Sequence, residues 1–159
     1  MNKEFNEHIK KSFKYGIKKE KEFANLFKES FEIIYANKHE NMFEHWDIKL
    51  NNIKIDVKGI KKYKGKLNDT IHYIELVNVR GDSGWLFGDG DGFAFETFNN
   101  WIIVEKKELQ EFMHDNIIDK QLYTIIQPYK LYQRKNRKDI MTIINTEDLL
   151  TLKNIKITK

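Results

Sequence analysis

The sequence predicts an α+β (α/β) fold in which a central mixed β-sheet is flanked by helices. Three features predict it: an apolar stripe of helical period near the N-terminus, apolar residues of period two from about residue 42, and glycines clustered between residues 81 and 92. The chain has 159 residues, 40% of them hydrophobic, which is enough to bury the core of one domain. We therefore expect a single domain over residues 1–159.

Residues 1–40 are expected to form an N-terminal helical region. After Gly16, the residues of one helical face follow at helical spacing: Glu20, Ala24, Phe27, Phe31 and Ile34. Because Glu20 shares this apolar face, it should point toward the sheet, where an acid needs a partner. Glu22 lies off that face and is the reserve candidate if the helix boundaries are shifted.

Residues 42–105 are expected to form the sheet, which begins with a hairpin turning at Asn51 and Asn52. Asn tolerates the positive φ that a two-residue turn requires. Apolar and polar residues alternate on both sides of the turn, with the apolar positions at Ile48, Leu50, Ile53, Ile55 and Val57. A two-residue turn sets the register, so that Asp47 faces Asp56 and Lys49 faces Lys54.

The rest of the chain continues the pattern of short strands and one more helix. A third strand is expected over Ile71–Val79, and two short strands over Phe93–Glu96 and Trp101–Glu105. Residues 106–159 are expected to supply a helix over Lys107–Met113 and a basic hairpin over Tyr129–Ile144. The helices and the sheet together give the α+β class.

The net charge of +4 comes from 28 Lys and Arg against 24 Asp and Glu, and it is unevenly distributed. Residues 47–66 and 128–159 each carry a net charge of +5, which leaves the remainder at −6. Two basic segments on an otherwise acidic chain indicate a face for a polyanion. The alternative is an ordinary solvated surface.

Several classes of protein are excluded by composition. Cysteine is absent, which excludes disulfides, zinc sites built on thiolates and a cysteine nucleophile. No apolar run reaches the length of about 18 residues that a membrane span requires, and charged residues occur throughout the first 15 positions. We therefore expect no membrane partner and a cytoplasmic location.

The paired aspartates of the hairpin indicate a metal site. Opposed strand residues have Cβ atoms about 5 Å apart, so the carboxylates of Asp47 and Asp56 repel unless a proton or cation lies between them. Mg²⁺, for which Mn²⁺ can substitute, prefers such oxygen ligands. Lys58 points to the same face and could orient or deprotonate an attacking water, or stabilise charge on a phosphate. The alternative is a solvated hairpin face on which neighbouring lysines neutralise both aspartates.

Glu75 interrupts the apolar run Ile71–Val77, in which a strand buried on both faces would exclude a charge. It either belongs to the acidic site or faces solvent on an edge strand. Together with Glu20, Asp47 and Asp56, it would place four acids around one lysine.

These residues resemble the PD-(D/E)XK nuclease superfamily, which has a restriction-endonuclease-like core. Its motif is a helix bearing an acid, then a hairpin bearing Asp followed by (Asp/Glu)-x-Lys, which matches Glu20, Asp47 and Asp56-Val57-Lys58. Trp46 stands where the motif has proline. The resemblance implies that Asp47, Asp56 and the Val57 carbonyl bind the metal, that Glu20 and Glu75 complete the acidic cluster, and that Lys58 positions the water.

A longer similarity, over residues 16–150, is to a group of phage and bacterial nuclease-like proteins. It comprises a Glu-bearing strand ending in Asn-Val-x-Gly, a Gly-Trp-Leu-(Tyr/Phe)-Gly turn and a basic tail, here residues 74–81, 84–88 and 129–139. Val77 stands where a basic residue would follow Glu75 and Leu76, so Lys58 must supply the lysine.

The resemblance implies a Mg²⁺-dependent endonuclease that acts on DNA, nicking it or recognising its structure, in a phage or mobile-element setting. A chain of this size leaves little room for a separate sequence-reading domain, so a homodimer or a targeting partner protein is expected to add specificity. The alternative is a catalytically inactive nucleic-acid-binding module on the same fold.

Three groups of residues are candidates for contacts with nucleic acid. Lysines follow the Asp-x-Lys strand and basic residues occupy the tip of the last hairpin, where they would bind phosphates: Lys61, Lys62, Lys64, Arg134, Lys135, Arg137 and Lys138. Trp85 lies in the glycine-rich loop and could be inserted beside a base. The alternative is a tight turn in which Trp85 and Phe87 fill the core.

Overall fold

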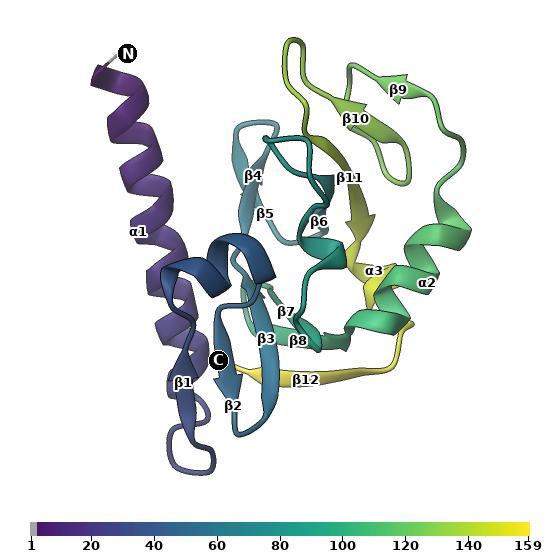
Figure 1. Ribbon diagram of the computed structural model, residues 1–159. Coiled ribbons are helices and arrows are strands. Elements are labelled where there is room, and N and C mark those ends of the chain that lie inside the picture. The colour runs from purple at the N-terminus through teal and green to yellow at the C-terminus, as the bar shows by residue number, and fades with distance from the viewer. Residues whose placement is uncertain (1–2) are drawn as a thin grey trace.

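The computed structural model describes residues 3–159, so residues 1 and 2 of the expected domain lie outside the described part (Figure 1). Its helices and helical turns are α1 (Lys3–Asn25), η1 (Glu40–Glu44), η2 (Trp85–Phe87), α2 (Lys106–Asn116) and α3 (Thr146–Leu149). Its strands are β1 (Ile33–Tyr35), β2 (Ile48–Leu50), β3 (Ile53–Lys58), β4 (Lys61–Tyr63), β5 (Lys66–Asn68), β6 (Ile71–Val77), β7 (Gly92–Glu96), β8 (Asn100–Glu105), β9 (Leu122–Tyr123), β10 (Leu131–Gln133), β11 (Ile140–Asn145) and β12 (Asn154–Thr158).

The α+β class is confirmed. Six strands form a mixed sheet in the order β1-β2-β3-β7-β8-β12, and four form a second sheet in the order β6-β11-β10-β9. A separate hairpin, β4–β5, links β3 to β6. Within the larger sheet β3 and β7 run parallel, while the other neighbours are antiparallel.

The predicted register of the first hairpin is confirmed. Ile48 pairs with Ile55 and Lys49 with Lys54, so the chain turns at the two asparagines. Asn51 has a φ of 52°, in the left-handed region that Asn adopts more readily than most residues. Asp47 directly precedes β2, and Asp56 lies in β3. The turn therefore places these two aspartates side by side.

One face of the larger sheet packs against α1. Phe23 of α1 is fully buried, and its ring centroid lies 5.1 Å from that of Trp101 on β8. Ala24 and Ala94 are buried in the same layer, where their small side chains allow the helix to approach the sheet. Burying the apolar stripe of α1 in this way stabilises the helix more than its intrinsic propensity does.

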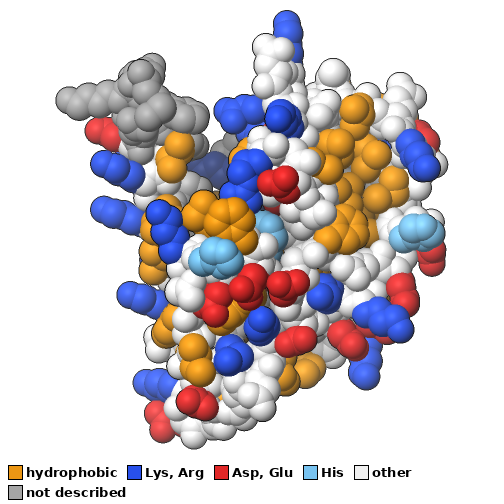
Figure 2. Space-filling view, viewed as in Figure 1, with side chains coloured by type: hydrophobic (Ala, Val, Ile, Leu, Met, Phe, Trp, Pro, Cys, Tyr) orange, Lys and Arg blue, Asp and Glu red, His pale blue; other side chains and the backbone are white. Residues whose placement is uncertain are grey.

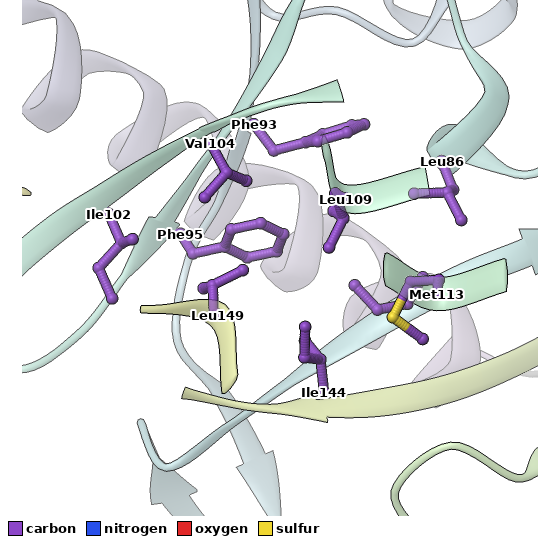
Figure 3. Packing of buried hydrophobic residues seen from close by; sticks show 10 residues of the cluster. Leu86, Phe93, Phe95, Ile102, Val104, Leu109, Met113, Ile144 and Leu149 are labelled. Carbon is purple, nitrogen blue, oxygen red and sulfur yellow. The ribbon is translucent and has the colours of Figure 1, made fainter. Parts of the chain in front are cut away.

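The opposite face of the sheet packs against the second sheet, α2 and α3 (Figure 3). Phe93 and Phe95 of β7 point into this layer, whereas Ala94 between them points toward α1. Figure 3 shows these two rings among side chains from η2, β8, α2, β11 and α3: Leu86, Ile102, Val104, Leu109, Met113, Ile144 and Leu149. A second sheet therefore covers much of a face that was expected to carry helices.

The predicted helical stripe extends too far toward the C-terminus. α1 ends at Asn25, and Phe27, Phe31 and Ile34 of the predicted stripe lie beyond it. The chain instead turns and pairs Ile33–Tyr35 with the edge of β2. The β-branched pair Ile33-Ile34 suits a strand, and the open edge of the sheet supplies hydrogen bonds that a longer helix would not use.

The expected boundaries of the sheet are also corrected. β6 lies within residues 42–105 but pairs with β11 in the second sheet, while β7 takes the place beside β3. From the C-terminal region, β12 joins the larger sheet along β8, and the basic hairpin β10–β11 pairs with β6. No helix within residues 3–159 has both the length and the apolar character needed to cross a bilayer.

Candidate active site

A cleft of about 610 Å³ opens between α1, the C-terminal end of β3, the start of β6 and the η2 turn. Four of the predicted acidic and metal-binding residues line this cleft: Glu20, Asp47, Asp56 and Val57. Lys58, Lys61 and Trp85 line it as well. Glu75 is not among the lining residues. The fold therefore gathers residues from four separate elements around the hairpin aspartates.

Asp47 is buried and held by two donors. Its Oδ2 accepts a hydrogen bond from the backbone N–H of Val57 at 2.6 Å, and its Oδ1 accepts one from Asn41 Nδ2 at 2.5 Å. Burial, and then the neighbouring carboxylate of Asp56, raise the pKa of Asp47 to about 8. Asp47 therefore retains its proton near neutral pH unless a cation offsets the two negative charges.

Asp56 is 3% exposed and pairs with Lys58. Lys58 Nζ lies 2.7 Å from Asp56 Oδ1 and 4.3 Å from the centroid of the Trp85 ring. Asp56 Oδ2 is buried and has no hydrogen-bond partner among the described residues. A buried carboxylate oxygen without a donor is costly, so this atom is the one most in need of a cation or a ligand.

Glu20 reaches the cleft from α1, on the inward-facing side that its helical spacing predicts. It is half-buried, and burial followed by the charge of Asp47 raises its pKa to about 7. The reserve acid, Glu22, instead pairs with Lys19 at 2.7 Å and does not line the cleft. The acid on the apolar stripe is therefore the one that joins the aspartates.

Glu75 lies on β6, behind the η2 turn. Its Oε2 accepts a hydrogen bond from the backbone N–H of Trp85 at 3.4 Å. Burial raises its pKa, and the charge of Asp139 raises it further, while the Trp85 hydrogen bond and Lys58 act in the opposite direction. Glu75 is therefore electrostatically linked to Lys58 but is not in the cleft with the other three acids.

Asn41, His45 and His72 also line the cleft and were not among the predicted site residues. Asn41 lies in η1 and binds Asp47, and no sequence pattern marked it. His45 has a φ of 57°, and burial lowers its pKa. Burial also lowers the pKa of His72 to about 4; its Nε2 lies 3.1 Å from the hydroxyl of Thr146, so it is a neutral, structural histidine.

Trp85 has two environments. Its ring centroid lies 5.0 Å from that of Phe93 in the core, and the same side chain lines the cleft beneath Lys58. Leu86 is the residue of the turn that is fully buried, whereas Phe87 is 52% exposed. The alternative in which Phe87 fills the core is therefore wrong, and Trp85 supports both the core and the site.

The lysines that follow β3 lie on the β4–β5 hairpin. Lys61 lines the cleft, with its Nζ 5.9 Å from the centroid of the Tyr15 ring. Lys62 is exposed on the same strand, and Lys64 occupies the turn with a φ of 49°. These three ammonium groups extend a basic surface outward from the cleft.

The basic residues of the β10–β11 tip differ in role. Arg134 makes two hydrogen bonds to Asp139 Oδ2, at 3.0 and 2.6 Å, and Asp139 is 1% exposed. Arg134 is therefore part of the hairpin structure, whereas Lys135 and Arg137 are exposed. Lys138 lies against Gly81. Figure 2 shows Lys and Arg side chains at the top of this face, where the hairpin tip lies, and acidic side chains nearer its middle.

The residues present fit Mg²⁺ in their donor chemistry. Asp47, Asp56 and the Val57 carbonyl supply hard oxygen donors, and the partnerless Asp56 Oδ2 and the raised pKa of Asp47 are both features that a cation would relieve. Within residues 3–159 no group of three or more His, Asp or Glu side chains is already arranged around one point. Water and substrate oxygens would have to complete the coordination.

Comparisons of the chain with protein-family models, with curated proteins and with solved structures found no match.

Proposed function

We propose that this protein is a metal-dependent endonuclease that hydrolyses DNA phosphodiester bonds on a restriction-endonuclease-like core. The observation that carries the proposal is the buried pair Asp47 and Asp56 beside Lys58 in an open cleft, where burial and then the charge of Asp56 raise the pKa of Asp47. Perturbed carboxylates paired with a cation in a cleft are typical of catalytic sites. The sequence resemblance supports the same assignment.

In this proposal Asp47, Asp56 and the Val57 carbonyl hold Mg²⁺, or Mn²⁺ in its place. The bound ion would polarise the scissile phosphate and lower the pKa of a water molecule. Lys58, fixed between Asp56 and the Trp85 ring, orients that water or neutralises charge developing on the phosphate. Glu20, with a pKa raised to about 7, can take up a proton near neutral pH.

The basic hairpins would hold the DNA. Phosphate contacts from Lys61, Lys62, Lys64, Lys135 and Arg137 give affinity with little sequence information. Specificity would then come from DNA structure, from a homodimer or from a targeting partner protein. We place the protein in the cytoplasm of a bacterium or of a phage-infected host, where it would nick DNA or act on particular DNA structures.

The test is cleavage of supercoiled plasmid, linear duplex and branched DNA in the presence of Mg²⁺, Mn²⁺ or EDTA. We expect metal-dependent cutting by the wild type and none by Asp56→Ala or Lys58→Ala. Asp115→Ala is the matched control, because Asp115 is an exposed aspartate near the end of α2 and does not line the cleft. Equal cutting by the wild type and both cleft variants would place the activity elsewhere or in a contaminant.

A specific observation favours a second candidate function, a catalytically inactive nucleic-acid-binding module. Both oxygens of Asp47 already accept hydrogen bonds, and Lys58 already neutralises one oxygen of Asp56. Such a module predicts salt-sensitive DNA binding that survives in Asp56→Ala and Lys58→Ala, with no cutting under any metal condition.

A further inference from the structure

The aromatic residues of the cleft form two walls and a floor. Phe13 and Tyr15 line it from α1, Tyr73 lines it from β6, and Trp85 lies beneath Lys58. Figure 1 shows the N-terminal half of α1 beside the β4–β5 hairpin. Lys61 of that hairpin lies opposite the Tyr15 ring of the helix. Aromatic rings and the ammonium groups of Lys58 and Lys61 therefore line the same opening.

The two tyrosine rings are held in place by their hydroxyl groups. The Tyr15 hydroxyl donates to the carbonyl of Ile60 at 3.0 Å, and the Tyr73 hydroxyl donates to the carbonyl of Lys62 at 3.1 Å. The first of these acceptors lies in the segment between β3 and β4, and the second lies in β4 itself. The ring faces are thus positioned before any ligand binds, which lowers the entropic cost of stacking against them.

Phe13 is the most exposed of these rings, at 66%. It lies on the helical stripe of Ile9, Gly16 and Glu20, and Ile9 is itself 50% exposed. Gly16 lies between Phe13 and Glu20 on this stripe. A Cβ at Gly16 would meet only Glu20 Oε1, at 3.9 Å, so no side chain stands between the Phe13 ring and the Glu20 carboxylate at this position of the helix. Phe13 and Glu20 are seven positions apart, a rise of about 10 Å along the helix, which equals about three stacked-base spacings.

We infer that the cleft takes an unpaired, single-stranded segment of nucleic acid, with a base stacked on Phe13 and phosphates beside Lys58 and Lys61. A duplex covers its base faces by internal stacking and would present only sugar and phosphate to these rings. Unpaired bases, in contrast, stack on aromatic side chains whatever their sequence, while lysines follow the backbone. The inference rests on the proposed function, because it names the substrate class of the same cleft.

The experiment measures binding of a short labelled oligonucleotide, single-stranded or annealed to its complement, by fluorescence anisotropy. EDTA is used in one arm and Ca²⁺ in the other, so that the result does not depend on Mg²⁺-driven cleavage. The wild type should bind the single strand at least about tenfold more tightly than the duplex in one or both arms, since stacking on one ring contributes about that factor.

Variants of Phe13 separate stacking from charge. Phe13→Ala should lose about tenfold in single-strand affinity and little in duplex affinity, and Phe13→Trp should retain the preference. Phe98→Ala is the matched control, because Phe98 is 53% exposed in the β7–β8 turn and does not line the cleft. Single-strand binding without cleavage of any substrate would leave this inference standing and overturn the nuclease proposal.

The inference would be overturned if, in both the EDTA arm and the Ca²⁺ arm, the protein bound the single strand and the duplex equally. Tighter binding of the duplex in both arms, or no binding of either form in both arms, would also overturn it. It would also be overturned if Phe13→Ala and Phe98→Ala had the same effect. Metal-dependent cutting of duplex DNA alongside any of these results would leave the nuclease proposal intact.

Discussion

Asp56→Asn should change the stability of the fold in opposite directions at low and high pH. The folded state raises the pKa of Asp47 from an ordinary value of 3.8 to about 8. Because the folded state holds this proton more tightly than the unfolded chain does, wild-type stability falls as the pH rises between those two values. The neighbouring Asp56 charge is one cause of that fall, and the variant removes it.

The magnitude follows from two opposing contributions. Two unit charges about 5 Å apart repel by about 3 kcal/mol at an effective dielectric constant of about 20. Losing the charged hydrogen bond between Asp56 and Lys58 costs about 2 kcal/mol while both groups are charged. The variant should therefore be about 2 kcal/mol less stable than the wild type at about pH 5, where Asp47 is protonated, and about 1 kcal/mol more stable at about pH 9.

The assay is thermal and urea unfolding in EDTA, followed by circular dichroism at both pH values. A swing of about 3 kcal/mol corresponds to about 6–12 °C in relative Tm for a chain of this length. Adding Mg²⁺ at the higher pH should raise the wild-type Tm and raise that of Asp56→Asn less, since the variant has lost one carboxylate ligand.

Lys58→Met is the matched control, because it removes the same ion pair and leaves both carboxylates in place. It should be destabilising at both pH values, and more so at the higher one, where two carboxylates would lack the neutralising ammonium. If Asp56→Asn were destabilising by the same amount at both pH values, the two aspartates would not interact as described.

Three further predictions concern the supporting structure. Gly84→Ala should cost about 2 kcal/mol in urea unfolding because its Cβ would collide with the backbone of β6, whereas Gly90→Ala, with no atom closer than 3.5 Å, should cost little. Glu96→Gln should cost about 3 kcal/mol because it leaves two lysines without their buried partner. In the wild type the same lysines hold the Glu96 pKa below its ordinary value of 4.5 against the effect of burial, so this stability is present above pH 4.5 and is lost as the pH falls through the lowered pKa. Arg134→Ala should lower Tm because it leaves the buried carboxylate of Asp139 without its partially exposed arginine partner, whereas Lys135→Ala should leave Tm unchanged and reduce the salt slope of DNA binding by about one.

The sequence determined the local geometry around the aspartates. The alternation of apolar and polar residues and the asparagine turn fix which residues of β2 and β3 face each other, because both depend on neighbours within about ten positions. The helical period likewise put Glu20 on the inward face of α1. These features are local, so they can be inferred without knowing how the rest of the chain packs.

Only the tertiary structure decided which distant elements meet. An apolar strand such as β6 can pair with any open edge, and it pairs with β11, which places Glu75 behind Trp85 instead of in the cleft. Asn41 binds Asp47 and Arg134 binds Asp139 over only six and five positions of the chain, yet no pattern of apolar and polar residues marks either pair. The pairing of β6 with β11, in contrast, depends on long-range packing, whose free energy is shared over the whole core and is not encoded at any single position.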